Sequence, residues 1–308
     1  MLGQDLHENT RPLRLMKKNS DNRKRTPSFQ AELPNGSPAF TLTELVVVIG
    51  VIALLAAMLL PALAQSQMKS QAIVCLSNMR QLQRAAMLYA NDNSDFLPKN
   101  YPLYQGGDSA TGKPCWVDGT MGWAGSPDMP AGCSTNPFYL GVNGLTGGNP
   151  VVTLIGSIGP YAKSAAVYHC PADHYIDPTY HVLRVRSCSA NLMIGCPSGN
   201  SLGADTIDYK AFEKYSDFGS PLGPSQCFEF LDENPVSLND GWFEYALDGS
   251  YNNDWPAINH ELATSFSFAD GHTELHRWHD VFLNPSPAYT NSGADTIWLA
   301  QHGTYRIQ

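Results

Sequence analysis

The hydropathy pattern is dominated by one unbroken apolar run near the N-terminus, from Leu45 to Leu60. With the four residues that follow, the run reaches 20 residues and ends at Ala64. An apolar helix of about 20 residues spans the hydrocarbon core of a bilayer, which is about 30 Å thick. A secretory signal segment would be shorter, and a small-residue cleavage site would follow it. The pattern therefore predicts a transmembrane helix over residues 40–64.

A helical pattern continues beyond this run. No Gly or Pro occurs from Gln65 to Asn91, and apolar residues recur at alternating spacings of four and three, as on one stripe of a helix: Met68, Ala72, Cys75, Met79, Leu82, Ala86 and Tyr89. Four polar residues lie off this stripe: Lys69, Arg80, Gln83 and Arg84. Asn and Asp residues from Asn91 onward and then Pro98 should end the helix. We expect residues 65–94 to continue the membrane helix onto a globular head.

After Pro98 the pattern changes to short apolar runs separated by Gly, Pro, Asn, Asp and Ser, which is typical of strands, turns and long loops. Residues 95–308 are therefore expected to form a globular head rich in antiparallel β-structure, which makes the chain an α+β protein. The candidate strands are Val151–Ile155, Val182–Arg186, Cys227–Leu231 and Gly241–Leu247, and a short helix is expected over Ser157–Ser164.

The clearest local signal in the head is a β-hairpin at Asp270-Gly271, a dipeptide that favours a two-residue type I′ turn. In that register one face, which we expect in the core, carries Phe266, Phe268 and Leu275. The other face, exposed to solvent or part of a site, carries Ser267, Ala269, His272, Glu274 and His276.

Charge is distributed unevenly along the 308 residues. Residues 1–39 hold seven basic and four acidic residues, whereas the rest holds 12 basic and 24 acidic residues, a net charge of −12. A basic segment directly before an apolar run is typical of the cytoplasmic side of a membrane helix. An acidic body lacks the basic surface that nucleic acid requires, so we expect no nucleic-acid partner.

No motif of catalysis stands out. The seven cysteines contain no Cys-x-x-Cys pair, and the chain has no phosphate-binding loop or dinucleotide fingerprint. We therefore expect that the protein is not an enzyme.

Glu44, a carboxylate at the start of the apolar run, is unusual because ionisable groups are costly there and are usually paired or functional. The surrounding sequence, GSPA-FTLTE before LVVVIGVIALLAAMLLPAL, resembles the type IV prepilin signal of pilins and type II secretion pseudopilins. The resemblance implies a pilin-like fold, with one long N-terminal helix packed on the head. It also implies cleavage between Ala39 and Phe40 by a prepilin peptidase, and N-methylation of Phe40. The family usually has Gly before the cut, where this chain has Ala39.

The same resemblance implies roles for two residues of the helix. Glu44 becomes the fifth mature residue, where it would neutralise the Phe40 ammonium group of a neighbouring subunit, and Pro61 occupies the place of a helix-bending proline. Residues 1–39 are then a removable basic leader, starting at Met1 or Met16. The expected partners are the prepilin peptidase, other pilin-like subunits and the lipid bilayer. The expected location is the cytoplasmic membrane, with a single span and the head in the periplasm or outside the cell.

A second resemblance lies in the head. His260, nine intervening residues and then Asp270-Gly271 resemble the H-X9-DG signature of a prepilin-processing-associated family, over residues 260–271. The segments CLSNMRQL and YHCPAD are also similar to that family. From this resemblance we predict that Cys75 is tied to the head, with Cys170 as the preferred disulfide partner. We expect a structural rather than catalytic role for His260 and a turn role for Asp270.

Two residue sets could hold a metal. Oxygen ligands suited to calcium come from Asp232, Glu233, Asn239 and Asp240, and pseudopilins of the resembling family use calcium structurally, but the spacing is not that of an EF-hand. His272, Glu274 and His276, with His260 and His279 near, could hold zinc. A solvated turn and a histidine-bearing solvent face are the simpler interpretations of the two sets, so no cofactor is expected.

Three functions remain open. The leading one is a pilin-like structural subunit of a type II secretion or type IV pilus-like system. A second is a membrane-tethered extracytoplasmic binding protein, for polysaccharide or another ligand, that does not polymerise. An anchored metal hydrolase is the third.

Overall fold

The longest element of the protein is helix α1, Leu42–Asp92. The computed structural model describes residues 40–100, 115–122, 127–128, 131–142, 157–196, 208–250, 254–280 and 293–307. Among these, α1 is a helix long and apolar enough to cross a membrane. It continues through Pro61 without interruption, which confirms the single long helix expected from the pattern; a bend at Pro61 stays a prediction. The chain divides into two compact units, residues 1–55 and 56–308.

A mixed five-stranded sheet forms the centre of the second unit, which confirms the α+β class. Its strands are β1 (Cys188–Asn191), β2 (Phe228–Asp232), β3 (Trp242–Phe243), β4 (Ala263–Phe268) and β5 (Thr273–Arg277), in the order β3-β1-β2-β4-β5. Only the β1–β3 pairing is parallel within this sheet. The other helical elements are η1 (Pro137–Leu140), α2 (Gly159–Ala162), η2 (Ala165–Tyr168), η4 (Tyr215–Asp217) and α3 (Ala294–Gly303).

Of the short strands and helices predicted from the sequence, the structure confirms some and contradicts others. The strand expected at 227–231 is confirmed as β2, whereas the one expected at 241–247 is only the two residues of β3. The strand expected at 182–186 is wrong, because only Leu183 forms a β-bridge, with Ile176. The helix expected at 157–164 is only the four residues of α2, since Lys163 takes a left-handed φ of 61° that stops it. Val151–Ile155 and the leader 1–39 lie outside the described residues.

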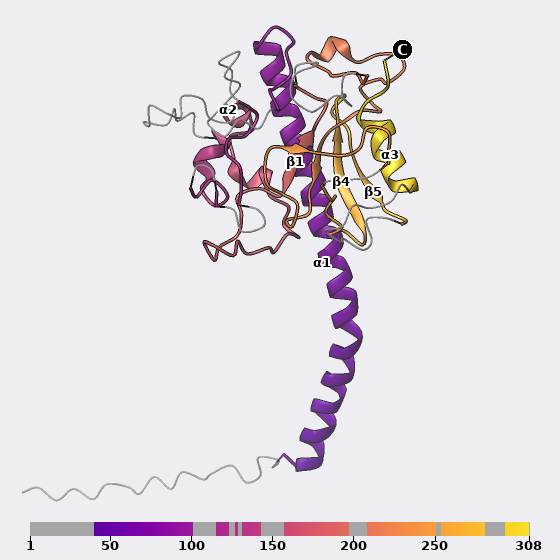
Figure 1. Ribbon diagram of the computed structural model, residues 1–308. Helices are drawn as coiled ribbons and strands as arrows, with labels where there is room; N and C mark the ends of the chain where they lie inside the picture. Colours follow the sequence, from indigo (N-terminus) through magenta and orange to yellow (C-terminus); the bar gives the residue numbers. More distant parts are fainter. Residues whose placement is uncertain are drawn as a thin grey trace, which may run out of the picture. The chain divides into compact units, whose positions relative to one another are not determined.

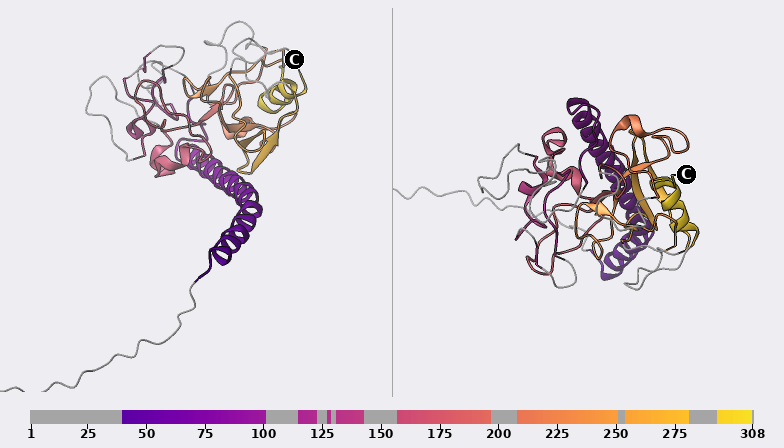
Figure 2. Two further views of the ribbon diagram at one scale, coloured as in Figure 1. Left: turned by 90° about the horizontal axis from the view of Figure 1, so that it is seen from below. Right: turned by 45° about the horizontal axis from the view of Figure 1, so that its top comes forward.

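The sheet has a packed layer on each face (Figures 1 and 2). On one face, the part of α1 within the second unit packs against Trp116, Tyr168 and Phe230. On the other face, α3 supplies Leu299 to a cluster rich in aromatic residues: Phe228, Phe243, Tyr245, Trp255, Phe266, Phe268 and Trp278. The part of α1 within the second unit therefore belongs to the core of the head.

The stripe predicted on α1 is confirmed for six of its seven residues, from Ala72 to Tyr89; Met68 is 39 % exposed. Gln83, which the pattern placed off the stripe, is fully buried. Its amide nitrogen donates to Glu229 and its amide oxygen accepts from Ser267 Oγ at 3.0 Å. Periodicity misses Gln83 because a polar residue can be buried wherever the facing sheet supplies partners.

The predicted register of the β4–β5 hairpin is wrong by one residue. Phe266 pairs with Glu274 and Ser265 with Leu275, so the loop has three residues rather than two. Gly271 takes the third loop position with a φ of 96°, which a residue without Cβ adopts at little cost. Residues opposite each other share a face of the sheet, so Leu275 lies on the face of the serines and is 39 % exposed. His272 and His276 lie with the phenylalanines, where His272 stacks on Phe268.

Candidate functional site

The start of α1 is a capping box. Glu44 Oε2 accepts from the backbone N–H and the hydroxyl of Thr41, at 2.9 and 2.8 Å, and Thr41 Oγ1 accepts from the Glu44 N–H at 3.2 Å. Glu44 is the only charged residue from Phe40 to Met68. Phe40 is 70 % exposed, and Ala39 lies outside the described residues. The cap explains how the helix can begin at Leu42.

The second group of functional side chains is buried inside the head, where four elements meet. Cys75 comes from the middle of α1, Cys170 follows η2, Asp232 ends β2, and His260 lies in the turn before β4. Their ligand atoms all lie within 4.8 Å of one another. We call these four residues the four-donor cluster; each is at most 5 % exposed.

Within the four-donor cluster the polar atoms face one another in pairs. Cys75 Sγ donates to Asp232 Oδ2 at 2.6 Å, and Cys170 Sγ lies 3.2 Å from His260 Nε2. His260 Nε2 is also 4.0 Å from Asp232 Oδ2. Burial raises the pKa of Asp232 to about 7 although the Cys75 thiol bonds to it, and burial lowers the pKa of His260. Burial also raises the pKa of Cys75 far above the usual thiol value.

The residues of the H-X9-DG motif lie at opposite ends of β4. His260 precedes the strand and turns its ring toward Cys170, whereas Asp270 follows it and accepts from the His272 N–H at 3.0 Å. Asp270 Oδ1 also lies 2.6 Å from His272 Nδ1. The six residues of β4 separate the two ends by about 20 Å. The motif thus supplies one residue to the four-donor cluster and, separately, a turn.

The two predicted metal sets are dispersed. Of the oxygen-ligand set, Asp232 belongs to the four-donor cluster, whereas Glu233 accepts a hydrogen bond from Ser189 Oγ. Asp240 accepts from the Trp242 N–H at 3.1 Å, and Asn239 is only half-buried. In the histidine set, His276 stacks on Trp298 with ring centroids 3.7 Å apart, and burial lowers its pKa to about 4. Within the described parts of the chain, only the four-donor cluster converges as metal ligands would.

The predicted disulfide partners are neighbours in the structure. Cys75 and Cys170 both belong to the four-donor cluster, and all seven cysteines are buried. The disulfide itself stays a prediction.

Glu229 is a buried carboxylate that no sequence pattern indicates. It is the extra residue of a β-bulge in β2, which turns its side chain toward α1. Gln83 Nε2 and Tyr215 Oη donate to Glu229 Oε2, the latter at 2.9 Å, whereas Oε1 has no partner among the described residues. Burial raises its pKa to about 7 despite these two hydrogen bonds.

The Glu229→Gln variant is expected to change how stability depends on pH. A carboxyl group whose pKa is higher in the folded state binds more protons there, so stability falls as pH rises from about 4.5 to about 7. Glutamine cannot ionise, so the free energy of unfolding of the variant relative to that of the wild type should grow by about 2.5 kcal/mol between pH 5 and pH 8.

The measurement is urea unfolding of the detergent-solubilised full-length chain. All six tryptophans follow residue 100, so their fluorescence reports on the head. Glu274→Gln, at a partly exposed position, controls for the loss of one negative charge. An advantage of Glu229→Gln that does not change between pH 5 and pH 8 would contradict the expectation.

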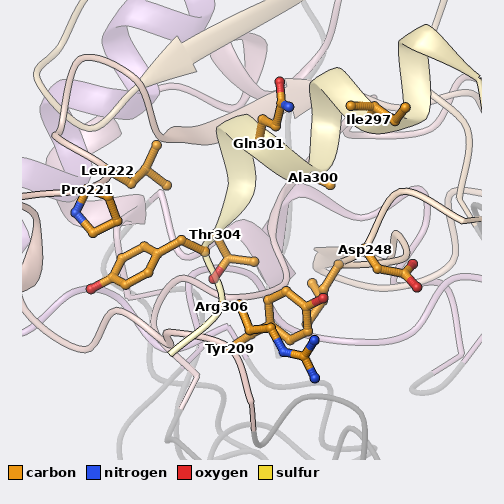
Figure 3. Close-up of a pocket in the computed structure, with 11 residues that line it drawn as sticks. Tyr209, Pro221, Leu222, Asp248, Ile297, Ala300, Gln301, Thr304 and Arg306 are labelled. Carbon is orange, nitrogen blue, oxygen red and sulfur yellow. The ribbon is translucent and has the colours of Figure 1, made fainter. Parts of the chain in front are cut away.

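A pocket of about 360 Å³ lies beside α3. Figure 3 shows Ile297, Ala300 and Gln301 on this helix, with Pro221 and Leu222 on one side. Leu247 and a set of polar and aromatic groups complete the lining: Tyr209, Asp248, Thr304, Tyr305 and Arg306. Aromatic faces next to hydrogen-bonding groups are a surface on which a sugar can bind.

No family model, no curated protein and no solved structure matches this chain.

Proposed function

We propose that this chain is a pilin-like structural subunit of a type II secretion or type IV pilus-like system. It is inserted in the cytoplasmic membrane by α1, cut between Ala39 and Phe40 by a prepilin peptidase, and N-methylated at Phe40. The head then lies in the periplasm or outside the cell. The chain is the substrate of an enzyme and performs no catalysis itself.

The observation that carries this proposal is the isolated charge of Glu44. An apolar helix start exposed to lipid disfavours a carboxylate, so a residue that serves only as a cap could be a glutamine. A carboxylate gains most where a cation from another chain reaches it in low dielectric. Cleavage before Phe40 would create such a cation, the new N-terminal ammonium group, on every subunit.

The packing of α1 supports the same proposal. Its apolar residues from Leu45 to Leu63 are exposed, whereas from Ala72 to Ala90 one stripe is buried in the core of the head. The first part of α1 therefore presents an exposed apolar surface, and its second part fixes the helix in the head. Lipid would cover this surface before assembly, and neighbouring helices would cover it within a polymer.

The test separates the charge of Glu44 from its cap. Glu44→Gln keeps the acceptor for the Thr41 N–H and removes the charge, Glu44→Ala removes both, and Thr41→Ala removes the hydroxyl cap and keeps the carboxylate. Crosslinking in membranes that contain the partner subunits should show multimers reduced about tenfold or more for both Glu44 variants, because losing about 1.4 kcal/mol per contact already changes an equilibrium tenfold. Thr41→Ala should assemble like the wild type.

All three variants should still insert in the membrane, which fractionation checks. Normal multimers in Glu44→Gln would contradict the proposal, and a defect that follows the cap, with Thr41→Ala as poor as Glu44→Ala, would assign Glu44 to helix initiation alone.

The pocket beside α3 favours a second candidate, a tethered binding protein that does not polymerise. Its lining of Tyr209, Tyr305 and Arg306 suits a polysaccharide segment. Binding of the full-length chain to a glycan array, lost in Tyr209→Ala and accompanied by no multimers in membranes, would favour this candidate.

A further inference from the structure

We propose that the four-donor cluster is a closed structural zinc site that fastens α1 to the sheet of the head. The inference does not depend on the proposed assembly role. It begins with the convergence of Cys75, Cys170, Asp232 and His260, which come from positions up to 185 residues apart in sequence and bring their ligand atoms within 4.8 Å.

The ligand types match zinc. Two thiolates, one imidazole and one carboxylate are borderline-soft and hard donors of the kinds that zinc binds in four-coordinate tetrahedral sites. Bonds of about 2.0–2.3 Å place tetrahedral ligand atoms about 3.3–3.8 Å apart. The distances of 3.2 Å between Cys170 Sγ and His260 Nε2 and of 4.0 Å between His260 Nε2 and Asp232 Oδ2 lie close to this range. Cys75 Sγ and Asp232 Oδ2, which are hydrogen-bonded at 2.6 Å, would separate by about 1 Å on binding the ion, a shift within the reach of side-chain torsions.

Charge supports a cation at this position. Asp232 is 1 % exposed, and its ion-pair contact in the described part of the chain is His260 alone, with no Lys or Arg. A buried carboxylate without a cationic partner is costly, and a bound divalent ion becomes the largest local charge. With two thiolates and Asp232, zinc leaves a net charge of −1 spread over four ligands.

The site has the character of a structural centre. All four side chains are buried and all four positions of a tetrahedron come from the protein, whereas a catalytic zinc keeps one position open for water. The ion would connect the middle of α1 with the end of β2 and with the turn before β4. It would thus hold the helix against the face of the sheet that Ser265 and Ser267 line.

A Cys75–Cys170 disulfide is the competing state of the same two sulfurs. It would use both sulfur ligands, so zinc and the disulfide exclude each other in one molecule. It would also remove the thiol that donates to Asp232, and that buried carboxylate would keep only His260, at 4.0 Å, as a cationic neighbour and Ser187 Oγ, at 3.4 Å, as a donor that the hydrogen bonds show. The full set of four converging donors is therefore explained by a metal, and only two of them by a disulfide.

The first test is metal content. The full-length chain, purified in detergent from membranes without chelators, should contain about one zinc per chain by inductively coupled plasma mass spectrometry. Cys170→Ser and His260→Gln should each lower zinc at least about tenfold, in line with the loss of a ligand. Cys227→Ser, a matched change at a buried thiol outside the cluster, should keep it. A wild-type chain without zinc, or ligand variants that retain it, would overturn the proposal.

Two further measurements keep the proposal falsifiable if the variants do not fold. Cobalt(II) exchanged into the wild-type chain should give the intense d–d bands of a tetrahedral site and a thiolate-to-cobalt charge-transfer band; a spectrum without thiolate ligation overturns the site. In the second measurement, the chain is denatured with a chelator and without reductant, its free thiols are alkylated, and its peptides are mapped by mass spectrometry. If the site holds zinc, both Cys75 and Cys170 should be alkylated. Two peptides joined by a Cys75–Cys170 disulfide would overturn the proposal.

Discussion

Replacing Gly195 by alanine is expected to prevent folding of the head or to lower its free energy of unfolding by about 3 kcal/mol or more. Gly195 has a φ of 69°, which costs other residues about 1–2 kcal/mol. A Cβ atom at this position would lie 1.9 Å from the carbonyl oxygen of Pro98 and 3.2 Å from the Asn100 nitrogen, so backbone has to move. The backbone is held on both sides, since the Gly195 N–H donates to Phe212 O at 2.8 Å and its carbonyl accepts from Asn100 N at 3.3 Å. Movement therefore also costs hydrogen bonds, each worth about 1 kcal/mol.

Gly223→Ala is the matched control. A Cβ atom there meets only Gln226 Oε1, at 3.9 Å, which is an ordinary contact. Urea unfolding of the detergent-solubilised full-length chains, followed by tryptophan fluorescence, should show a wild-type midpoint for Gly223→Ala and a strongly lowered one for Gly195→Ala. Equal midpoints would contradict the close packing of Gly195 against the Pro98 carbonyl group.

Phe266→Ala is expected to lower the free energy of unfolding by about 3–5 kcal/mol, the usual cost of deleting a buried aromatic ring. The ring is fully buried, and its centroid lies 5.4 Å from Phe228, 6.0 Å from Trp278 and 5.2 Å from Trp298. Its removal leaves a cavity between β4 and α3 that rigid aromatic neighbours cannot fill.

Leu275→Ala is the control that also tests the register. In the register of a two-residue turn, Leu275 would share the core face with Phe266, and its loss would cost about 2–5 kcal/mol. In the observed register it is 39 % exposed on the opposite face, so we expect less than about 1 kcal/mol. A large loss for Leu275→Ala would contradict the three-residue loop.

The parts of the fold that sequence predicts are those encoded by local periodicity. Helix α1 follows from a long apolar run and a stripe with no Gly or Pro after Pro61, and both signals need only neighbouring residues. The strand expected at 182–186 fails because its polar residues are buried instead of exposed. Arg184 donates to Leu238 O at 2.9 Å and Arg186 to Cys188 O at 2.8 Å, so hydrogen bonds to a loop and to the start of β1 fix this segment.

The type of turn between β4 and β5 is the second feature that sequence alone does not predict. Asp270-Gly271 is compatible with a two-residue loop and with a three-residue loop that places Gly271 at its last position. The sequence does not distinguish them. Phe266 and Phe268 face the aromatic cluster in either register, whereas the three-residue loop places His272 on Phe268 and His276 on Trp298.

The four-donor cluster shows what sequence can indicate and what it cannot. The sequence indicates Cys75 and Cys170 as a pair, but it places Asp232 and His260 in two different candidate sites. Their convergence depends on the β2–β4 pairing and on the contact of α1 with the sheet, which join residues 157 positions apart. Glu229 gave no signal at all, since a β-bulge places it.

Mass spectrometry of the N-terminus tests the pilin-like assignment most directly. The chain is isolated from membranes of cells that contain an active prepilin peptidase, and its intact mass and N-terminal peptide are measured. We expect a mature chain that begins with N-methylated Phe40, whether translation starts at Met1 or Met16. A chain that retains its leader through Ala39 in these cells would contradict the assignment.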